Sequence, residues 1–304
     1  MSQKLWEASL FNKNKSNLLN FEKFISKRFN YKPSKNYNKL FNWSIKYPKY
    51  FWSSVWDYTN VKGKKSDKFK FTKDFIKNKF FVKSKLNFAE NLLSKEDNSK
   101  AITFISETGY KEVRSWSELH KNTSKLIHFF RQNKISEKDR IAAYTANQIE
   151  TIECFLATSA IGAIWSSCSP DFGASGLIER FSQIKPKILI ITDRYYYNGK
   201  EINILERLPI ILKKIKSIKT VIVINYPGKK NLKYKKLKNV KIFNLKKIKK
   251  IQQKKIIFKK FDFDHELAIL YSSGTTGKPK CICHRAGGVL LQHLKEHTLH
   301  CEIN

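Results

Sequence analysis

The 304-residue chain lacks any apolar run of the roughly 18 to 20 residues that a membrane-spanning helix needs. The most apolar stretch, residues 155–165, is too short and includes Thr158, Ser159 and Gly162. We therefore interpret it as a buried helix that runs into a strand. The first residues contain neither an apolar segment nor the small-residue cleavage site of a secretion signal. These absences argue against an integral membrane protein and favour a cytoplasmic one.

Cysteine is scarce, with five residues that form no C-x-x-C pair. An odd number without paired spacing argues against a zinc site or a disulfide framework, and reduced thiols in the cytosol fit better.

Acidic residues are also scarce. The chain has 60 Lys and Arg against 25 Asp and Glu, a net charge of +35. Such an excess raises nucleic-acid or anionic-membrane binding as alternatives. The excess is almost entirely lysine, however, and lysine is a poor substitute for the forked guanidinium that reads bases. We interpret the charge as a solvated surface, and residues 229–260, which contain no acidic residue, as a surface excursion or a non-specific phosphate contact.

Strands and helices alternate from about residue 87 onward. Short β-branched or apolar runs predict strands at 101–105, 139–144, 163–167, 188–192 and 220–224. Helices are predicted between them at 148–161, 175–184 and 202–215, and a capping box, Ser115 to Glu118, predicts the start of another. This spacing implies right-handed crossovers and an α/β fold with mostly parallel sheets that helices cover on both faces.

We expect four parts along the chain. Residues 1–85 form an aromatic segment of short helices and loops, and residues 86–228 form a first α/β subdomain. The Lys-rich residues 229–260 separate it from a second subdomain, of which residues 261–304 are the start.

One polar stretch follows the apolar run at 267–270, and it reads YSSGTTGKPK from Tyr271 to Lys280. Gly274 and Gly277 allow positive φ and a close backbone approach to a ligand. Successive amides in such a loop form an anion-binding concavity, to which hydroxyls, Lys278 and Lys280 add donors and charge. The stretch therefore suits a polyphosphate, although a flexible polar hairpin is the alternative.

This stretch is not a Walker A loop, which needs four residues between its glycines and then a helix. Here two threonines separate the glycines, Pro279 follows the lysine, and a strand is predicted at 281–284.

The stretch resembles the phosphate-binding signature of the acyl-adenylate-forming (AMP-binding) enzymes. Within that superfamily, residues 41–63, 87–93, 164–190 and 279–303 resemble the acetoacetyl-CoA synthetases. The resemblance covers nearly the whole chain and fades across residues 229–260.

The resemblance implies the large N-terminal domain of that fold and an acid–thiol ligase that uses ATP, Mg²⁺ and coenzyme A. Acetoacetate and ATP would give an acyl-adenylate and pyrophosphate, and the coenzyme A thiol would then release AMP. Other short acids such as acetate or propionate remain alternatives, and a non-catalytic basic fragment that binds nucleic acid is another.

The resemblance also assigns residues. The phosphate-binding loop comprises Ser272, Ser273, Gly274, Thr275, Thr276, Gly277 and Lys280. Thr276 would carry the hydroxyl nearest the metal, and Lys280 would make the charged contact with the phosphates. His284 is a candidate for the acyl or nucleotide site or a structural histidine, and Lys200 is a candidate for the coenzyme A phosphate or a surface turn. No catalytic residue is assigned, because the adenylating lysine of the family falls beyond residue 304. We therefore expect an N-terminal part that does not complete adenylation alone.

Overall fold

The computed structural model describes residues 14–34, 36–234, 239–272 and 277–303. The chain divides into two compact units. Unit 1 comprises Met1–Leu86, Asp262–Asp264 and Gly287–Asn304, and unit 2 comprises Asn87–Phe261 and His265–Ala286. No helix among the described residues is long and apolar enough to cross a membrane.

Unit 1 is built from short helices around an aromatic core. Its elements are α2 (Asn17–Ser26), α3 (Tyr37–Lys46), α4 (Pro48–Tyr58), β1 (Gly63–Lys64), η1 (Phe75–Lys77), β2 (Lys85–Leu86), β12 (Phe261–Asp262), α11 (Ala286–Leu294) and the π-helical η3 (Lys295–His300). Phe21 of α2 is fully buried, and its ring meets the rings of Phe51 and Tyr58 edge to face at centroid distances of 5.8 and 5.3 Å. Aromatic burial of this kind lets short helices form a core.

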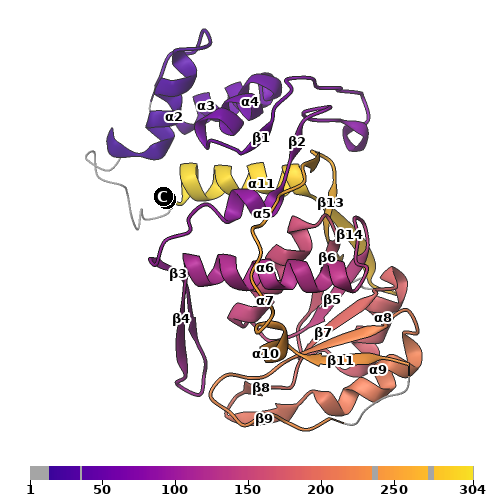
Figure 1. Cartoon of the computed structure of the whole chain (residues 1–304). Helices are drawn as coiled ribbons and strands as arrows, with labels where there is room; N and C mark the ends of the chain where they lie inside the picture. Colours follow the sequence, from indigo (N-terminus) through magenta and orange to yellow (C-terminus); the bar gives the residue numbers. More distant parts are fainter. Residues whose placement is uncertain (1–13, 35, 235–238, 273–276, 304) are drawn as a thin grey trace, which may run out of the picture. The chain divides into compact units, whose positions relative to one another are not determined.

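A seven-stranded sheet forms the centre of unit 2 (Figure 1). Its strands are β5 (Arg140–Tyr144), β6 (Ile164–Cys168), β7 (Ile188–Thr192), β10 (Thr220–Ile224), β11 (Lys241–Asn244), β13 (Glu266–Ser272) and β14 (Lys280–Arg285). They lie in the order β11-β10-β7-β5-β6-β13-β14, and all neighbours are parallel except β13 and β14. The predicted α/β class with a mostly parallel sheet is therefore confirmed.

Helices follow the strands in the doubly wound manner. The chain passes from β5 to its neighbour β6 through α7 (Ile149–Ala160), then returns past β5 to β7 through α8 (Ala174–Ile184) and continues to β10 through α9 (Leu208–Lys214). Right-handed crossovers that run in opposite directions place α7 on one face and α8 and α9 on the other. The direction reverses at β5, which makes the carboxyl ends of β5 and β7 a topological switch point.

The remaining elements of unit 2 are α5 (Phe88–Leu92), β3 (Lys100–Ile105), β4 (Lys111–Ser115), α6 (Trp116–Gln132), β8 (Arg194–Tyr197), β9 (Lys200–Asn203), η2 (Leu205–Arg207) and α10 (Leu245–Ile248). The capping box is confirmed: Ser115 accepts from the backbone of Glu118, whose carboxylate accepts from the Ser115 N–H. The predicted helix at 202–215 is wrong in its first part. Residues 200–203 pair with β8 instead, and Pro209, which is favoured in a first turn, sets a later helix start.

The Lys-rich stretch contributes to this sheet. Lys241–Asn244 forms the edge strand β11, and α10 buries Leu245 and Ile248. β13 and β14 then join the other side of the same sheet, next to β6. The described part of 229–260 therefore differs from the predicted excursion between two sheets, because its scattered apolar residues are enough for a half-buried edge strand and one helical turn.

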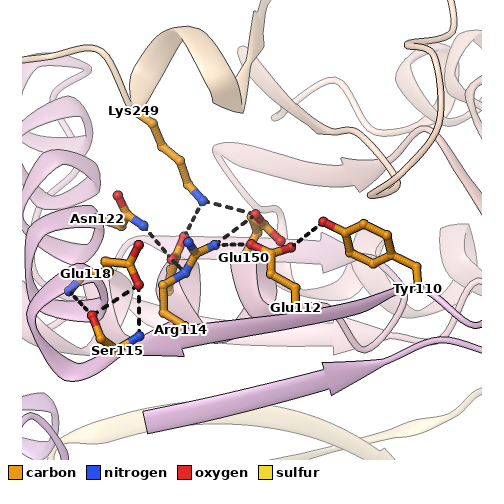
Figure 2. A network of polar contacts seen from close by, with 9 residues as sticks. Tyr110, Glu112, Arg114, Ser115, Glu118, Asn122, Glu150 and Lys249 are labelled. Carbon is orange, nitrogen blue, oxygen red and sulfur yellow. Dashed lines mark hydrogen bonds and ion pairs between the residues drawn. The ribbon is translucent and has the colours of Figure 1, made fainter. Parts of the chain in front are cut away.

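A network of buried charges attaches α10 to the rest of unit 2 (Figure 2). The Glu153 carboxylate on α7 is fully buried and lies 2.8 Å from Lys249 Nζ, 3.0 Å from Arg114 Nε and 2.8 Å from Asn122 Nδ2. Arg114 Nη2 also lies 2.9 Å from Glu112 Oε1 and 3.5 Å from Glu150 Oε1. Burial lowers the pKa of Arg114 and of Lys249, but the surrounding carboxylates outweigh it and leave both pKa values raised. The network thus holds its cations charged.

Candidate phosphate-binding hairpin

The polar stretch closes a hairpin at the carboxyl end of β13. β13 and β14 are antiparallel, and Ser272 pairs directly with Lys280. Residues 273–276, which include the predicted Ser273, Gly274, Thr275 and Thr276, lie outside the described residues. The structure therefore describes the two ends of the predicted loop, Ser272 on one side and Gly277 to Lys280 on the other.

Backbone geometry at the second end of the loop requires glycine. Gly277 has φ +97°, and a Cβ added there would meet no atom of the described residues within 4 Å. The position is open, so only the backbone conformation demands glycine. This matches the predicted need for positive φ.

The strand register places the predicted polar residues on one face of the hairpin. Residues directly opposite in an antiparallel pair share a face, and so do alternate residues of one strand. Ser272, Lys280 and His284 therefore lie on the same face, with His284 opposite Ala268. The structure thus brings together Ser272 and Lys280, and it places His284 four residues farther along β14.

α8 covers the opposite face of β13, and β6 borders β13 within the sheet. Ile269 and Tyr271 pack against the core that includes Leu177 and Phe181 of α8. Ser166 of β6 donates to the Ile269 carbonyl at 2.8 Å and lies 3.3 Å from the Tyr271 hydroxyl. Burial raises the pKa of Tyr271. This phenol therefore acts as a neutral anchor beneath the loop.

Gln183 on α8 contacts the second end of the predicted loop, at Pro279. Its amide donates to the Pro279 carbonyl at 2.9 Å and lies 3.7 Å from Cys281 Sγ. The sequence offered no signal for this contact, since a lone glutamine near a helix end is usually a solvated residue. The hairpin is therefore held at both β6 and α8, which pre-orders the ends of a loop whose backbone would wrap phosphates.

Lys200 lies elsewhere in unit 2. Asn198 and Gly199 have positive φ and form the turn between β8 and β9, and Lys200, at the start of β9, is exposed. β8 follows β7, which is three strand positions, or roughly 14 Å, from β13 across the sheet. The structure does not bring Lys200 together with Ser272 and Lys280.

Cys168 and Asp171 have structural surroundings. Burial raises the pKa of the Cys168 thiol to about 11, and the Asp171 carboxylate accepts from Ser169 Oγ at 2.6 Å. Cys168 is the last residue of β6, and Asp171 lies in the turn that follows it. The five cysteines are free thiols.

Among the residues that the structure describes, no group of three or more His, Cys, Asp and Glu side chains could hold a metal ion.

Comparison with known proteins identifies relatives of this arrangement. The model of the AMP-binding enzyme family matches residues 91–301. The chain is 39% identical over 267 residues to an acetoacetyl-coenzyme A synthetase of Rhizobium meliloti (strain 1021), with 88% of this chain and 41% of the relative covered. It is 38% identical over 273 residues to an acetoacetyl-CoA synthetase of Gallus gallus, with 87% and 41% covered.

A solved structure is also similar. The acetoacetyl-CoA synthetase from Streptomyces lividans matches with a TM-score of 0.90 and 27% identity, over 99% of this chain and 46% of that one. The chain thus spans about two fifths of the length of the curated relatives that it matches. Since the family model matches more than half of its residues, the chain belongs to the family of AMP-binding enzymes.

Proposed function

We propose that this chain is the pyrophosphate-holding part of an ATP-dependent acid–CoA ligase whose acid is acetoacetate. The observation that carries the proposal is the hairpin in which Ser272 faces Lys280 at the carboxyl end of a buried strand, in a chain of the AMP-binding enzyme family. The relatives named acetoacetyl-CoA synthetase support the choice of acid.

The reaction explains why such a loop is needed. A carboxylate is a weak nucleophile, so its attack on the α-phosphate of ATP depends on stabilising the charge that moves onto the leaving pyrophosphate. Pre-ordered amides, hydroxyls and one lysine around that pyrophosphate stabilise this charge where it develops. The coenzyme A thiol then attacks the acyl-adenylate, the thioester forms, and AMP leaves.

The roles of individual residues follow from the motif. Ser272, Ser273, Gly274, Thr275, Thr276 and Gly277 would wrap the β- and γ-phosphates, and the Lys280 ammonium would contact them. Mg²⁺ would be held through the phosphates, with the Thr276 hydroxyl nearest to it, and would neutralise phosphate charge.

Two further assignments belong to the proposal. His284 shares a face with Lys280 and would lie beside the nucleotide or the acyl group. Lys200, on an exposed turn remote from the hairpin, would contact a phosphate of coenzyme A, which is long enough to span the distance across the sheet. The reaction would take place in the cytoplasm.

The experiment that tests the proposal is the exchange of labelled pyrophosphate into ATP, measured on the whole gene product with acetoacetate, acetate and propionate in turn. We expect exchange that depends on acetoacetate and is abolished by Lys280→Met. Equal exchange with all three acids would reject acetoacetate, and no exchange with any acid would reject the ligase.

A further inference from the structure

A hollow lies in unit 2 at the switch point of the sheet, away from the hairpin. Its volume is about 360 Å³. It is bounded by the loop after β5 with the start of α7, by the end of β3, by β8 and by Tyr226 after β10. In open α/β sheets, ligands bind outside the carboxyl ends of the strands where the winding direction reverses. The volume also falls within the usual range of small-molecule sites.

Gln148 lies in the wall of this hollow, and its buried side-chain amide has one atom without a hydrogen-bond partner among the described residues. The side chain is 1% exposed, and its Oε1 lies 3.0 Å from Thr192 Oγ1. Its Nε2 has no hydrogen-bond partner among the described residues. An unsatisfied buried donor costs about 1 to 3 kcal/mol, so a native protein keeps one for a reason.

Turning the amide over does not remove the problem. The Thr192 hydroxyl has a single proton and also lies 2.8 Å from the Arg194 carbonyl, to which it can donate. If it does so, it accepts from the Gln148 NH₂ group, and the Gln148 oxygen becomes the unused end. In either orientation one buried polar atom of Gln148, a residue of the hollow's wall, has no partner among the described residues, and Gln148 makes no side-chain cap to α7.

The walls around this amide are aromatic and apolar. Tyr196 and Tyr226 lie with their ring centroids 5.0 Å apart at 55°, and Tyr195 belongs to the same wall. Ile105 and Ile152 also line the hollow and are 67% and 36% exposed. Exposed isoleucines and tyrosine rings beside one unpaired amide favour a flat ring with a polar edge over a free anion.

We propose that this hollow binds a small neutral aromatic compound that carries an amide, with its ring between the tyrosines and the isoleucines and its amide paired to Gln148. A primary amide has both a donor and an acceptor, so it satisfies Gln148 in either orientation. Among the described residues of the wall, the one carboxylate is that of Glu107, and it already accepts from the Gly199 N–H at 3.0 Å. A neutral ligand therefore meets no unpaired charge there.

The probe is benzamide, and its binding to the 304-residue chain is measured by saturation-transfer difference NMR at about 1 mM, a concentration suited to weak ligands. We expect saturation transfer to benzamide, and less to cyclohexanecarboxamide, which has no aromatic ring, and to toluene, which has no amide. Gln148→Leu should weaken benzamide binding about tenfold. The Gln148→Leu substitution removes an unsatisfied polar group from the folded state, so we expect no loss of folding stability.

Two further variants complete the test. Thr103→Trp, at an exposed position in the wall, should block binding without touching the buried amide. Gln132→Leu, an exposed glutamine on α6, and Lys280→Met should both leave binding unchanged. The proposal fails if benzamide shows no transfer with the natural chain, or if Gln148→Leu binds it as well as the natural chain does.

Discussion

At the residue scale, the hairpin combines a cation opposite Ser272 with one special backbone position. Lys280 is the cation that faces Ser272, and Gly277 supplies the conformation that lets the chain return to β14. The two would contribute differently, since the proposal has Lys280 contact the phosphates, whereas Gly277 permits the conformation of the loop. Their substitutions therefore separate binding chemistry from loop geometry.

Lys280→Met should weaken the binding of magnesium pyrophosphate to the 304-residue chain about 10- to 100-fold, because a charge-assisted hydrogen bond contributes about 1.5 to 3 kcal/mol. Isothermal titration calorimetry measures this directly. Lys241→Met, at the exposed start of β11, is the matched control and should bind like the natural chain. An equal loss in both variants would mean that surface charge alone attracts the ligand.

Gly277→Ala should also weaken pyrophosphate binding, because alanine at φ +97° is strained by about 1 to 2 kcal/mol. Gly109→Ala is the control, since Gly109 has φ +77° and equally open surroundings in the β3–β4 hairpin. Both variants should lower the urea midpoint by similar amounts, and only Gly277→Ala should change the pyrophosphate affinity. Unchanged affinity would show that the backbone of residue 277 does not shape the site.

At the element scale, buried and half-buried charges connect segments that are distant in sequence. Lys249, the C-cap residue of α10, contacts Glu153 of α7 through the network in Figure 2, and Asp139, just before β5, pairs with Lys187, just before β7. Both contacts hold the sheet and its covering helices in one arrangement. Each can be tested on its own.

Lys249→Met should destabilise unit 2 by about 3 kcal/mol, because it removes one of the two cations that pair with the fully buried Glu153 carboxylate. The free energy of unfolding in urea measures this effect. Lys250→Met is the control, since Lys250 is exposed on the next turn. The double variant Lys249→Met with Glu153→Gln should recover part of the loss. If the two losses simply add, the two side chains are not coupled.

Asp139→Asn tests stability against pH. Burial raises the pKa of Asp139, but hydrogen bonds from Lys187 and Ser136 outweigh burial and leave the pKa below its usual 3.8. A lowered folded-state pKa means that the carboxylate contributes stability above the unfolded pKa and loses it as pH falls through the folded pKa.

The natural chain should therefore exceed Asp139→Asn in stability by about 1 kcal/mol at pH 7, a value reduced because Lys187 is half exposed. The difference should shrink below about pH 4. Urea unfolding at pH 7, 5 and 3 measures this. A difference that stays constant with pH would show that ionisation of Asp139 contributes nothing.

Much of this element structure could be predicted from the sequence. The strand at 188–192 and the helix at 175–184 have compact apolar runs or clear periodicity, and the structure has them within a residue. β11 was missed because an edge strand needs few apolar residues, and Ile242 and Phe243 lie among lysines and asparagines. Gln183 and Gln148 could not be predicted as site residues, because their importance arises only from contacts across the fold. The predicted roles of Lys280, His284 and Lys200 stay predictions.

At the scale of the whole molecule, the net charge of +35 is the dominant property. Some of the lysines form ion pairs within the chain: Lys249, Lys259 and Lys260 pair with Glu153, Glu137 and Glu90, respectively. We expect random-sequence duplex DNA to bind only at low salt, with an affinity that falls steeply as salt rises, and no measurable binding at about 0.15 M. Fluorescence anisotropy at a series of salt concentrations measures this, and tight binding that persists at the highest salt would favour a nucleic-acid-binding protein instead.

The placement of β13 next to β6 also affects the order of assembly. Ser166 bonds to the carbonyl of Ile269, a residue 103 positions later. Such a distant partner is a high-contact-order pairing, and closing so large a loop is slow. The neighbouring strands β5, β6, β7 and β10 can pair as soon as each crossover forms, whereas β13 must wait for the entire intervening chain. We therefore expect the docking of β13 onto β6 to be among the late steps in the folding of unit 2.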